Sequence, residues 1–85
     1  MDYQVTLAVS ALQEFRALSW DIKNRLKLSV DSLRENPRPP GVRKIQGRED
    51  LYRLRIGSYR IVYEIDDQER IIRIIRVRHR RDAYR

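Results

Sequence analysis

Cationic and apolar residues alternate along residues 51–65, and this alternation is the feature that most constrains the fold. Successive side chains of a β-strand point to opposite faces, so two strands joined at Gly57-Ser58 would separate the two kinds of residue. The face predicted to join the core receives Tyr52, Leu54, Ile56, Ile61, Tyr63 and Ile65. The opposite face receives Arg53, Arg55, Arg60, Val62 and Glu64. The segment therefore predicts an antiparallel hairpin with one apolar and one cationic face.

A second cationic pattern lies near the C-terminus. A strand is predicted over residues 70–79, with Ile75 and Val77 on one face. Its other face would carry Arg76, Arg78 and Arg80. The letters IIRII within it do not alternate cleanly, which indicates a β-bulge or burial on both faces. If this strand lies beside the hairpin, the arginines of all three strands form one cationic surface.

The N-terminal half predicts one strand and two helices. We expect a strand over residues 3–7, helices over about 8–18 and 21–35, and a short strand over 42–45. The letters PRPPG between the second helix and that strand end the helical part. The prediction is one α+β domain over residues 1–85. In it, an N-terminal strand and helix hairpin pack on a mainly antiparallel, twisted sheet of four or five strands with a short basic tail.

The charge of the chain favours a polyanionic ligand. The net charge is +7, and residues 43–85 carry thirteen Lys and Arg against seven Asp and Glu. Sixteen of the nineteen cations are Arg, whose planar fork pairs with phosphate in a bidentate manner. The arginine content points to nucleic acid, although the charge alone also fits an anionic membrane surface or an acidic protein.

Several classes of site are excluded by what the sequence lacks. It has no cysteine, which removes disulfides, thiolate zinc sites and a cysteine nucleophile. Its glycines lie far apart and form no phosphate-binding loop, and no His, Asp or Glu residues have the spacing of metal ligands. We therefore expect no metal and no cofactor. Without a signal peptide or a membrane span, a cytoplasmic location is expected.

His79 and Tyr84 are the side chains near the cationic pattern best suited to chemistry. His79 is the only histidine, and a histidine transfers protons readily near neutral pH. Tyr84 can stack on a base or pass a proton through its hydroxyl. Both residues also have structural interpretations, as a core histidine and a packing aromatic. RNA carries its own nucleophile, the 2′-OH, so an arginine face with these groups at its rim would suit RNA cleavage without a metal.

The stretches LYRLRIGSYRIVYEIDD and VRHRRDAYR resemble the RelE/ParE superfamily of toxins from type II toxin–antitoxin systems, and are nearest to the RelE-type messenger-RNA interferases. The resemblance covers essentially the whole chain. It implies a RelE-like fold and an enzyme that cleaves messenger RNA in the ribosomal A site by metal-independent attack of the 2′-OH. It also implies a RelB-like antitoxin as partner, and operator DNA bound indirectly through that antitoxin.

The resemblance implies roles for individual residues. Arg60 and Arg80 would stabilise the phosphate and the leaving oxygen, and Tyr84 would stack beneath a base. Because Arg is a poor general base, the base would be His79 or Tyr84, or the ribosome would orient the reaction. The remaining RNA contacts would come from Arg53, Arg55, Arg76, Arg78 and Arg81. Two other functions stay open at this point: a ParE-like inhibitor of DNA gyrase and a non-catalytic RNA-binding module.

Overall fold

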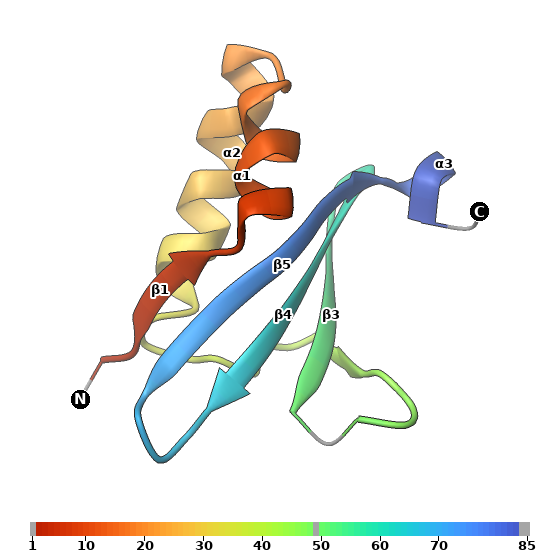
Figure 1. Cartoon of the computed structure of the whole chain (residues 1–85). Coiled ribbons are helices and arrows are strands. Elements are labelled where there is room, and N and C mark those ends of the chain that lie inside the picture. The colour runs from red at the N-terminus through yellow and green to blue at the C-terminus, as the bar shows by residue number, and fades with distance from the viewer. Residues whose placement is uncertain (1, 49, 84–85) are drawn as a thin grey trace.

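The fold is a five-stranded sheet with two helices beside it and a helical turn at its end (Figure 1). The computed structural model describes residues 2–48 and 50–83. In chain order the elements are β1 Gln4–Leu7, α1 Val9–Arg16, α2 Trp20–Ser32, β2 Arg43–Lys44, β3 Leu51–Ile56, β4 Tyr59–Asp66, β5 Ile71–His79 and α3 Arg80–Ala83. The predicted strand and helix hairpin ahead of a β-meander are confirmed, with boundaries that differ by at most three residues.

The sheet has the strand order β1-β5-β4-β3-β2, in which β1 runs parallel to β5 and all other neighbours are antiparallel. The β3–β4 hairpin closes at Ile56 and Tyr59, as its alternation predicts. Gly57 has a φ of +61°, which the first central residue of a two-residue hairpin turn needs and which glycine adopts without strain. The chain therefore has the mainly antiparallel α+β architecture expected from its pattern.

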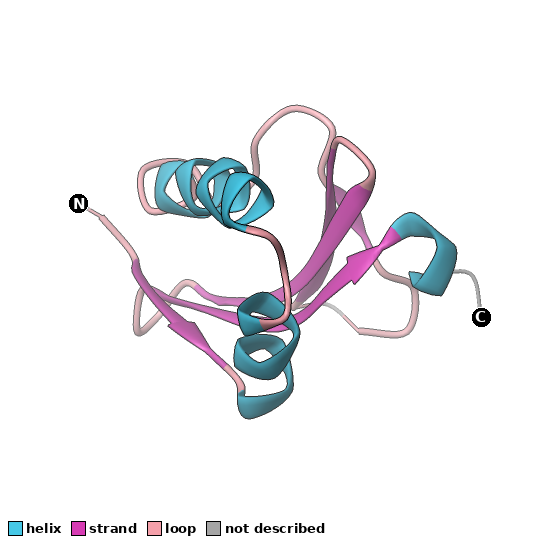
Figure 2. Ribbon diagram, turned by 90° about the horizontal axis from the view of Figure 1, so that it is seen from above, coloured by secondary structure: helices cyan, strands magenta, loops and turns pink. Residues whose placement is uncertain are grey.

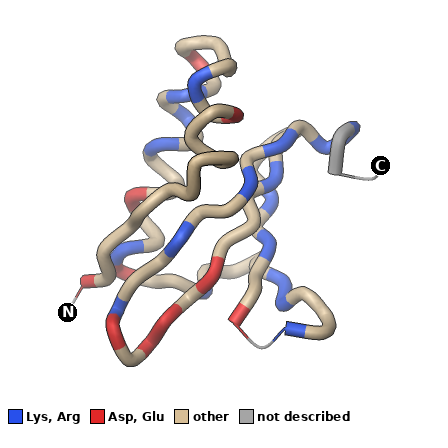
Figure 3. The backbone as a smooth tube through the Cα atoms, in the orientation of Figure 1, with Lys and Arg blue, Asp and Glu red and all other residues tan. Residues whose placement is uncertain are grey.

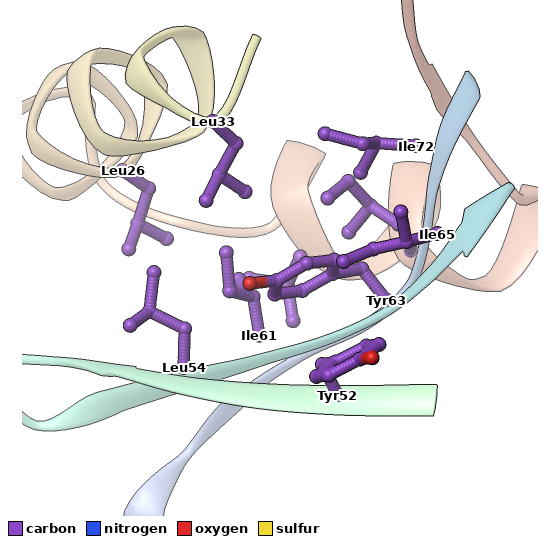
Figure 4. Packing of buried hydrophobic residues seen from close by; sticks show 11 residues of the cluster. Leu26, Leu33, Tyr52, Leu54, Ile61, Tyr63, Ile65 and Ile72 are labelled. Atoms are coloured by element: carbon purple, nitrogen blue, oxygen red, sulfur yellow. The ribbon is translucent and has the colours of Figure 1, made fainter. Parts of the chain in front are cut away.

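Helix α2 covers the apolar face of the sheet (Figure 2). Leu26 of this helix and Leu33, which caps its C-terminal end, point toward Leu54, Ile61 and Tyr63 of the hairpin (Figure 4). Among the described residues, the buried apolar side chains are Ala11, Leu26, Leu33, Tyr52, Leu54, Ile61, Tyr63, Ile65, Ile72, Ile74 and Val77. Full burial of a side chain of this size stabilises the fold by about 1.5–3 kcal/mol. The opposite face of the sheet, called the outer face below, bears the arginines.

A β-bulge in β5 changes which residues reach the core. Tyr63 of β4 pairs with Ile74, but the next pair is Val62 with Arg76, so Ile75 has no partner in β4. A shift of one residue exchanges the two faces of a strand. Ile72 and Ile74 are buried before the bulge and Val77 after it. The bulge considered for IIRII is confirmed, and it interrupts the simple alternation predicted for the strand.

Helix α1 replaces β1 as the neighbour of β5 beyond Ile74. The backbone N–H of Ala8 donates to the carbonyl of Ile74 at 2.8 Å, and the Ser10 hydroxyl donates to the carbonyl of Ile75, also at 2.8 Å. One turn later, a carboxylate oxygen of Glu14 accepts the backbone N–H of Val77 at 3.0 Å. The edge of β5 therefore has partners on α1 at and beyond the bulge.

The proline-rich loop before β2 is fixed by hydrogen bonds to the sheet. The buried Tyr63 hydroxyl donates to the carbonyl of Pro37 at 2.8 Å, and burial raises the pKa of Tyr63 to about 12. Arg38 donates to both carboxylate oxygens of Asp67 and, at 3.1 Å, to the Tyr52 hydroxyl. The Arg38 guanidinium and then the Tyr3 hydroxyl hold the pKa of Asp67 below its ordinary value. These bonds join the loop to the turn between β4 and β5.

Two further features concern the chain ends and the helices. The short basic tail expected after His79 begins with the helical turn α3. Within the described part of the chain, none of the helices has the length and apolar character that crossing a bilayer requires.

We expect Tyr63→Phe to lower the free energy of unfolding by about 1 kcal/mol, because the buried Pro37 carbonyl would lose its donor. In thermal unfolding this corresponds to a melting temperature lower by about 4–8 °C. Tyr59→Phe is the matched control, since the Tyr59 hydroxyl has no hydrogen-bond partner among the described residues. Equal losses in the two variants would contradict the assignment of the loop anchor to Tyr63.

Candidate functional site

Arginines lie directly opposite one another on the outer face of the sheet. One row across β3, β4 and β5 consists of Arg55, Arg60 and Arg78, which are register partners. Residues opposite each other in an antiparallel pair lie only about 4.5–5.5 Å apart at Cβ, and like charges in such pairs are destabilising. A row of three cations therefore needs negative charge nearby to offset its repulsion, either from the protein itself or from a ligand.

A second row lies two residues along the strands, and β2 extends it. Arg43 of β2 is the partner of Arg53, which pairs in turn with Val62 and then Arg76. Alternate residues of a strand are separated by about 6.5 Å. The two rows together therefore form a cationic surface two residues deep, with Val62 as its apolar centre.

The β2 side of this surface forms a hollow. Its volume is about 560 Å³, and we call it the arginine hollow; it is lined by Gly41, Arg43, Arg53, Arg55, Gly57 and Arg60. Gly41 ends the proline-rich loop and Gly57 starts the hairpin turn, so both walls are set by turns of the backbone. The structure thus brings together three of the predicted RNA-contacting or catalytic residues, Arg53, Arg55 and Arg60.

Acidic residues are placed away from the arginine hollow. Lys and Arg lie along β3, β4 and β5 toward α3, while Asp and Glu gather at the opposite end of the sheet (Figure 3). Glu64 is engaged by Arg48 at 2.6 Å and by Arg73 at 3.6 Å. Within the described residues, no carboxylate lies within 4.0 Å of the guanidinium groups of Arg43, Arg53 or Arg55. The hollow therefore keeps positive charge available for a ligand.

The β5 side of the surface is different, because α1 supplies a counter-charge there. One oxygen of Glu14 accepts a hydrogen bond from Nε of Arg78 at 3.0 Å and lies 3.6 Å from Nη1 of Arg76. Glu14 is 24% exposed, so this carboxylate is partly shielded from water. Arg76 and Arg78 share the outer face with the hollow, as predicted, but they are paired.

The first turn of the tail is attached to the hairpin turn beside the hollow. The backbone N–H of Arg80 donates to the carbonyl of Ser58 at 2.7 Å. The side chains of Arg80 and Arg81 are exposed at this end of the sheet. Two further predicted residues are therefore placed near Gly57, on a helical turn and not on the continuation of β5.

His79 is not brought together with the arginine hollow. It pairs in register with Tyr59, which shares a face of β4 with the buried Ile61 and lies opposite to Arg60. His79 therefore belongs to the helix side of the sheet. Its ring meets the Tyr59 ring edge-on at 5.2 Å, and its Nδ1 accepts the backbone N–H of Arg81 at 3.2 Å. Tyr84, the other residue predicted as a possible general base, lies outside the described residues.

Arg43 is the lining residue that the sequence reasoning missed. Its strand has only two residues, too few for a pattern of alternation, and only its register with Arg53 places it on the outer face. Among residues 2–48 and 50–83, no three His, Asp or Glu side chains are grouped so that they could hold a metal. The chemistry that the site offers is binding and charge stabilisation of a phosphate or carboxylate by guanidinium groups.

Comparisons with known proteins agree with this arrangement. The family described as ParE toxin of type II toxin–antitoxin system, parDE, matches residues 5–84. A RelE-like toxin protein of Escherichia coli is 33% identical to the chain, and the mRNA interferase toxin RelE of Escherichia coli strain K12 is 31% identical. Both alignments cover 99% of this chain and 92% of the relative. The archaeal RelE–RelB complex from Pyrococcus horikoshii OT3 has a TM-score of 0.83 at 28% identity, covering 94% of this chain and 97% of that chain.

The matched range spans almost the whole chain and extends from within β1 through α3. The solved archaeal relative has the same α+β architecture. This chain therefore belongs to the RelE/ParE superfamily, the toxins of type II toxin–antitoxin systems.

Proposed function

We propose that this chain is a ribosome-dependent endoribonuclease that cleaves messenger RNA in the ribosomal A site. The observation that carries the proposal is the row of arginines directly opposite one another on β3, β4 and β5, continuous with the arginine hollow. Within the described residues, no carboxylate lies within 4.0 Å of the guanidinium groups of Arg43, Arg53 or Arg55 in that hollow. A relative 31% identical to the chain is named an mRNA interferase, which supports the same activity.

The proposed reaction uses the RNA as its own nucleophile. The 2′-oxygen loses its proton and attacks the adjacent phosphorus, and the bond from phosphorus to the 5′-oxygen breaks. The 5′-oxygen takes up a proton, which leaves a 2′,3′-cyclic phosphate on one product and a 5′-hydroxyl on the other. Negative charge grows on the phosphoryl oxygens during the attack, and fixed cations that face it stabilise the transition state.

In this proposal each arginine has a role that follows from its position on the sheet or the tail. Arg60 lies at the centre of the row, with Arg55 and Arg78 on either side, and stabilises the phosphate. Arg53 and Arg43 position the RNA backbone at the second row. Arg80 acts on the leaving oxygen from the tail, and Tyr84 stacks beneath a base. No role in proton transfer is assigned to His79, because it lies on the helix side of the sheet.

The proposed physiological partner is an antitoxin. The solved archaeal relative is a complex with RelB, and a RelB-like chain is the proposed counterpart here. Such a chain would cover the cationic surface and offset its self-repulsion, since net positive charge in one place destabilises the free toxin. Operator DNA would then be bound through the antitoxin.

The test is primer extension on a defined message in a purified translation system, with toxin added and with or without ribosomes. We expect cuts within the A-site codon only when ribosomes are present.

The family that matches the chain is described as ParE toxin, so a gyrase-inhibiting function has a specific observation in its favour. Absence of cuts under both conditions, together with gyrase inhibition in a supercoiling assay, would replace the proposal with that function.

In the same assay we expect Arg60→Ala to lower the cleavage rate about 100-fold or more, the loss typical of removing one preorganised donor to a developing anion. Arg16→Ala is the control. This variant removes the same charge from an exposed position in the last turn of α1. Its cleavage rate should stay within about twofold of the native rate, because electrostatic steering alone is weakly sensitive to one distant charge. Equal rates for the two variants would remove Arg60 from the site.

A further inference from the structure

The carboxylate of Glu14 contacts both the backbone of β5 just after the bulge and two arginines of the cationic surface. Its Oε1 accepts the backbone N–H of Val77, two residues after the bulge, at 3.0 Å. Its Oε2 accepts Nε–H of Arg78 at 3.0 Å and lies 3.6 Å from Arg76. One side chain of α1 therefore contacts both the backbone that sets the register of β5 and the cations that this register places outward.

The bulge decides the direction of these cations. If β5 continued in strict alternation through Ile75, Arg76 and Arg78 would lie on the same face as Ile74, toward the core, and Val77 would point outward. The register after the bulge is held from α1 by the Ser10 hydroxyl on the Ile75 carbonyl and by Glu14 on the Val77 N–H.

We propose that Glu14 is a positioning residue for RNA cleavage, which acts through Arg76 and Arg78 and through the register of β5. The inference rests on the proposed function only for its cleavage readout. The bond from Glu14 uses Nε of Arg78, and none of the described residues is bonded to the Nη groups of that arginine. The guanidinium is thereby fixed in orientation while its outer edge remains able to meet phosphate.

Both carboxylate oxygens are needed for this role. In Glu14→Gln the amide oxygen can still accept the Val77 N–H, but the amide nitrogen is a donor and cannot accept from Arg78. The variant therefore keeps the backbone bond and loses both the hold on the arginine and one negative charge. Glu64→Gln is the matched control. Glu64 is also 24% exposed and bonded to cations, Arg48 and Arg73, but it contacts neither arginine that Glu14 holds.

The first readout is the nuclear magnetic resonance signal of Arg78 Nε–H, measured on the folded toxin without RNA or ribosomes. We expect its exchange with solvent to accelerate about tenfold or more in Glu14→Gln, as for a hydrogen bond that is lost. In Glu64→Gln the signal should be unchanged. An unchanged signal in Glu14→Gln would overturn the proposal whether or not the toxin cleaves RNA.

The second readout separates binding from cleavage, with a short single-stranded RNA oligonucleotide as the binding probe. Each variant loses one negative charge near the surface, so neither should bind the probe more weakly than the native chain. The slope of the logarithm of the binding constant against the logarithm of the salt concentration should steepen by up to about 0.7. Ribosome-dependent cleavage should fall about tenfold in Glu14→Gln, because small misplacements of catalytic groups are costly, and stay within twofold in Glu64→Gln.

Two results would reject the positioning role. One is weaker RNA binding together with a lowered melting temperature in Glu14→Gln, which would make Glu14 a purely structural residue. The other is cleavage by Glu14→Gln at the native rate. If the native chain itself does not cleave, the proposed function fails, while the Arg78 signal still decides whether Glu14 holds that side chain.

Discussion

The bulge at Ile75 is the local constraint on which the two faces of β5 depend. Before it, β5 buries Ile72 and Ile74 against the core. After it, the same strand presents Arg76 and Arg78 outward while Val77 fills the core beside Ile61. A strand with a strict period of two could not satisfy both halves, because either the apolar or the cationic residues would face the wrong side. The bulge thus joins an apolar half-strand to a cationic half-strand without a break in the sheet.

The carboxylates of Glu14, Glu64 and Asp67 pair with cations around the arginine hollow. Glu14 holds Arg76 and Arg78 of β5, and Glu64 is engaged by Arg48 and Arg73. Neither carboxylate is paired with Arg43, Arg53 or Arg55 of the hollow. Asp67 joins Arg38 and anchors the loop that ends at the wall of the hollow. These acidic residues therefore fix the parts of the chain around the cationic surface, while Arg43, Arg53 and Arg55 have no carboxylate within 4.0 Å among the described residues. This arrangement favours a site built for a polyanion over a face whose charges serve solubility alone.

Much of this structure can be predicted from local sequence. The alternation on either side of Gly57 suffices for the hairpin, its core face and the three arginines of β3 and β4, because the period of a strand is fixed by backbone geometry. Arg43 could not be predicted, since a two-residue strand has no period. The role of Glu14 could not be predicted either, because its partners lie 63 and 64 residues away in the chain. The face of His79 depends on the bulge, which the pattern IIRII indicates but does not place.

The central proposal for this chain is that the arginine face stabilises a phosphate under attack by the neighbouring 2′-oxygen. The most direct measurement uses a message with a single 2′-deoxynucleotide placed at the cleavage position of the A-site codon, translated by purified ribosomes in the presence of the toxin. We expect the cut at that position to disappear, while an unmodified message is cleaved to a 2′,3′-cyclic phosphate. A cut that persists at the 2′-deoxynucleotide would contradict the proposal, because the RNA would then not supply the nucleophile.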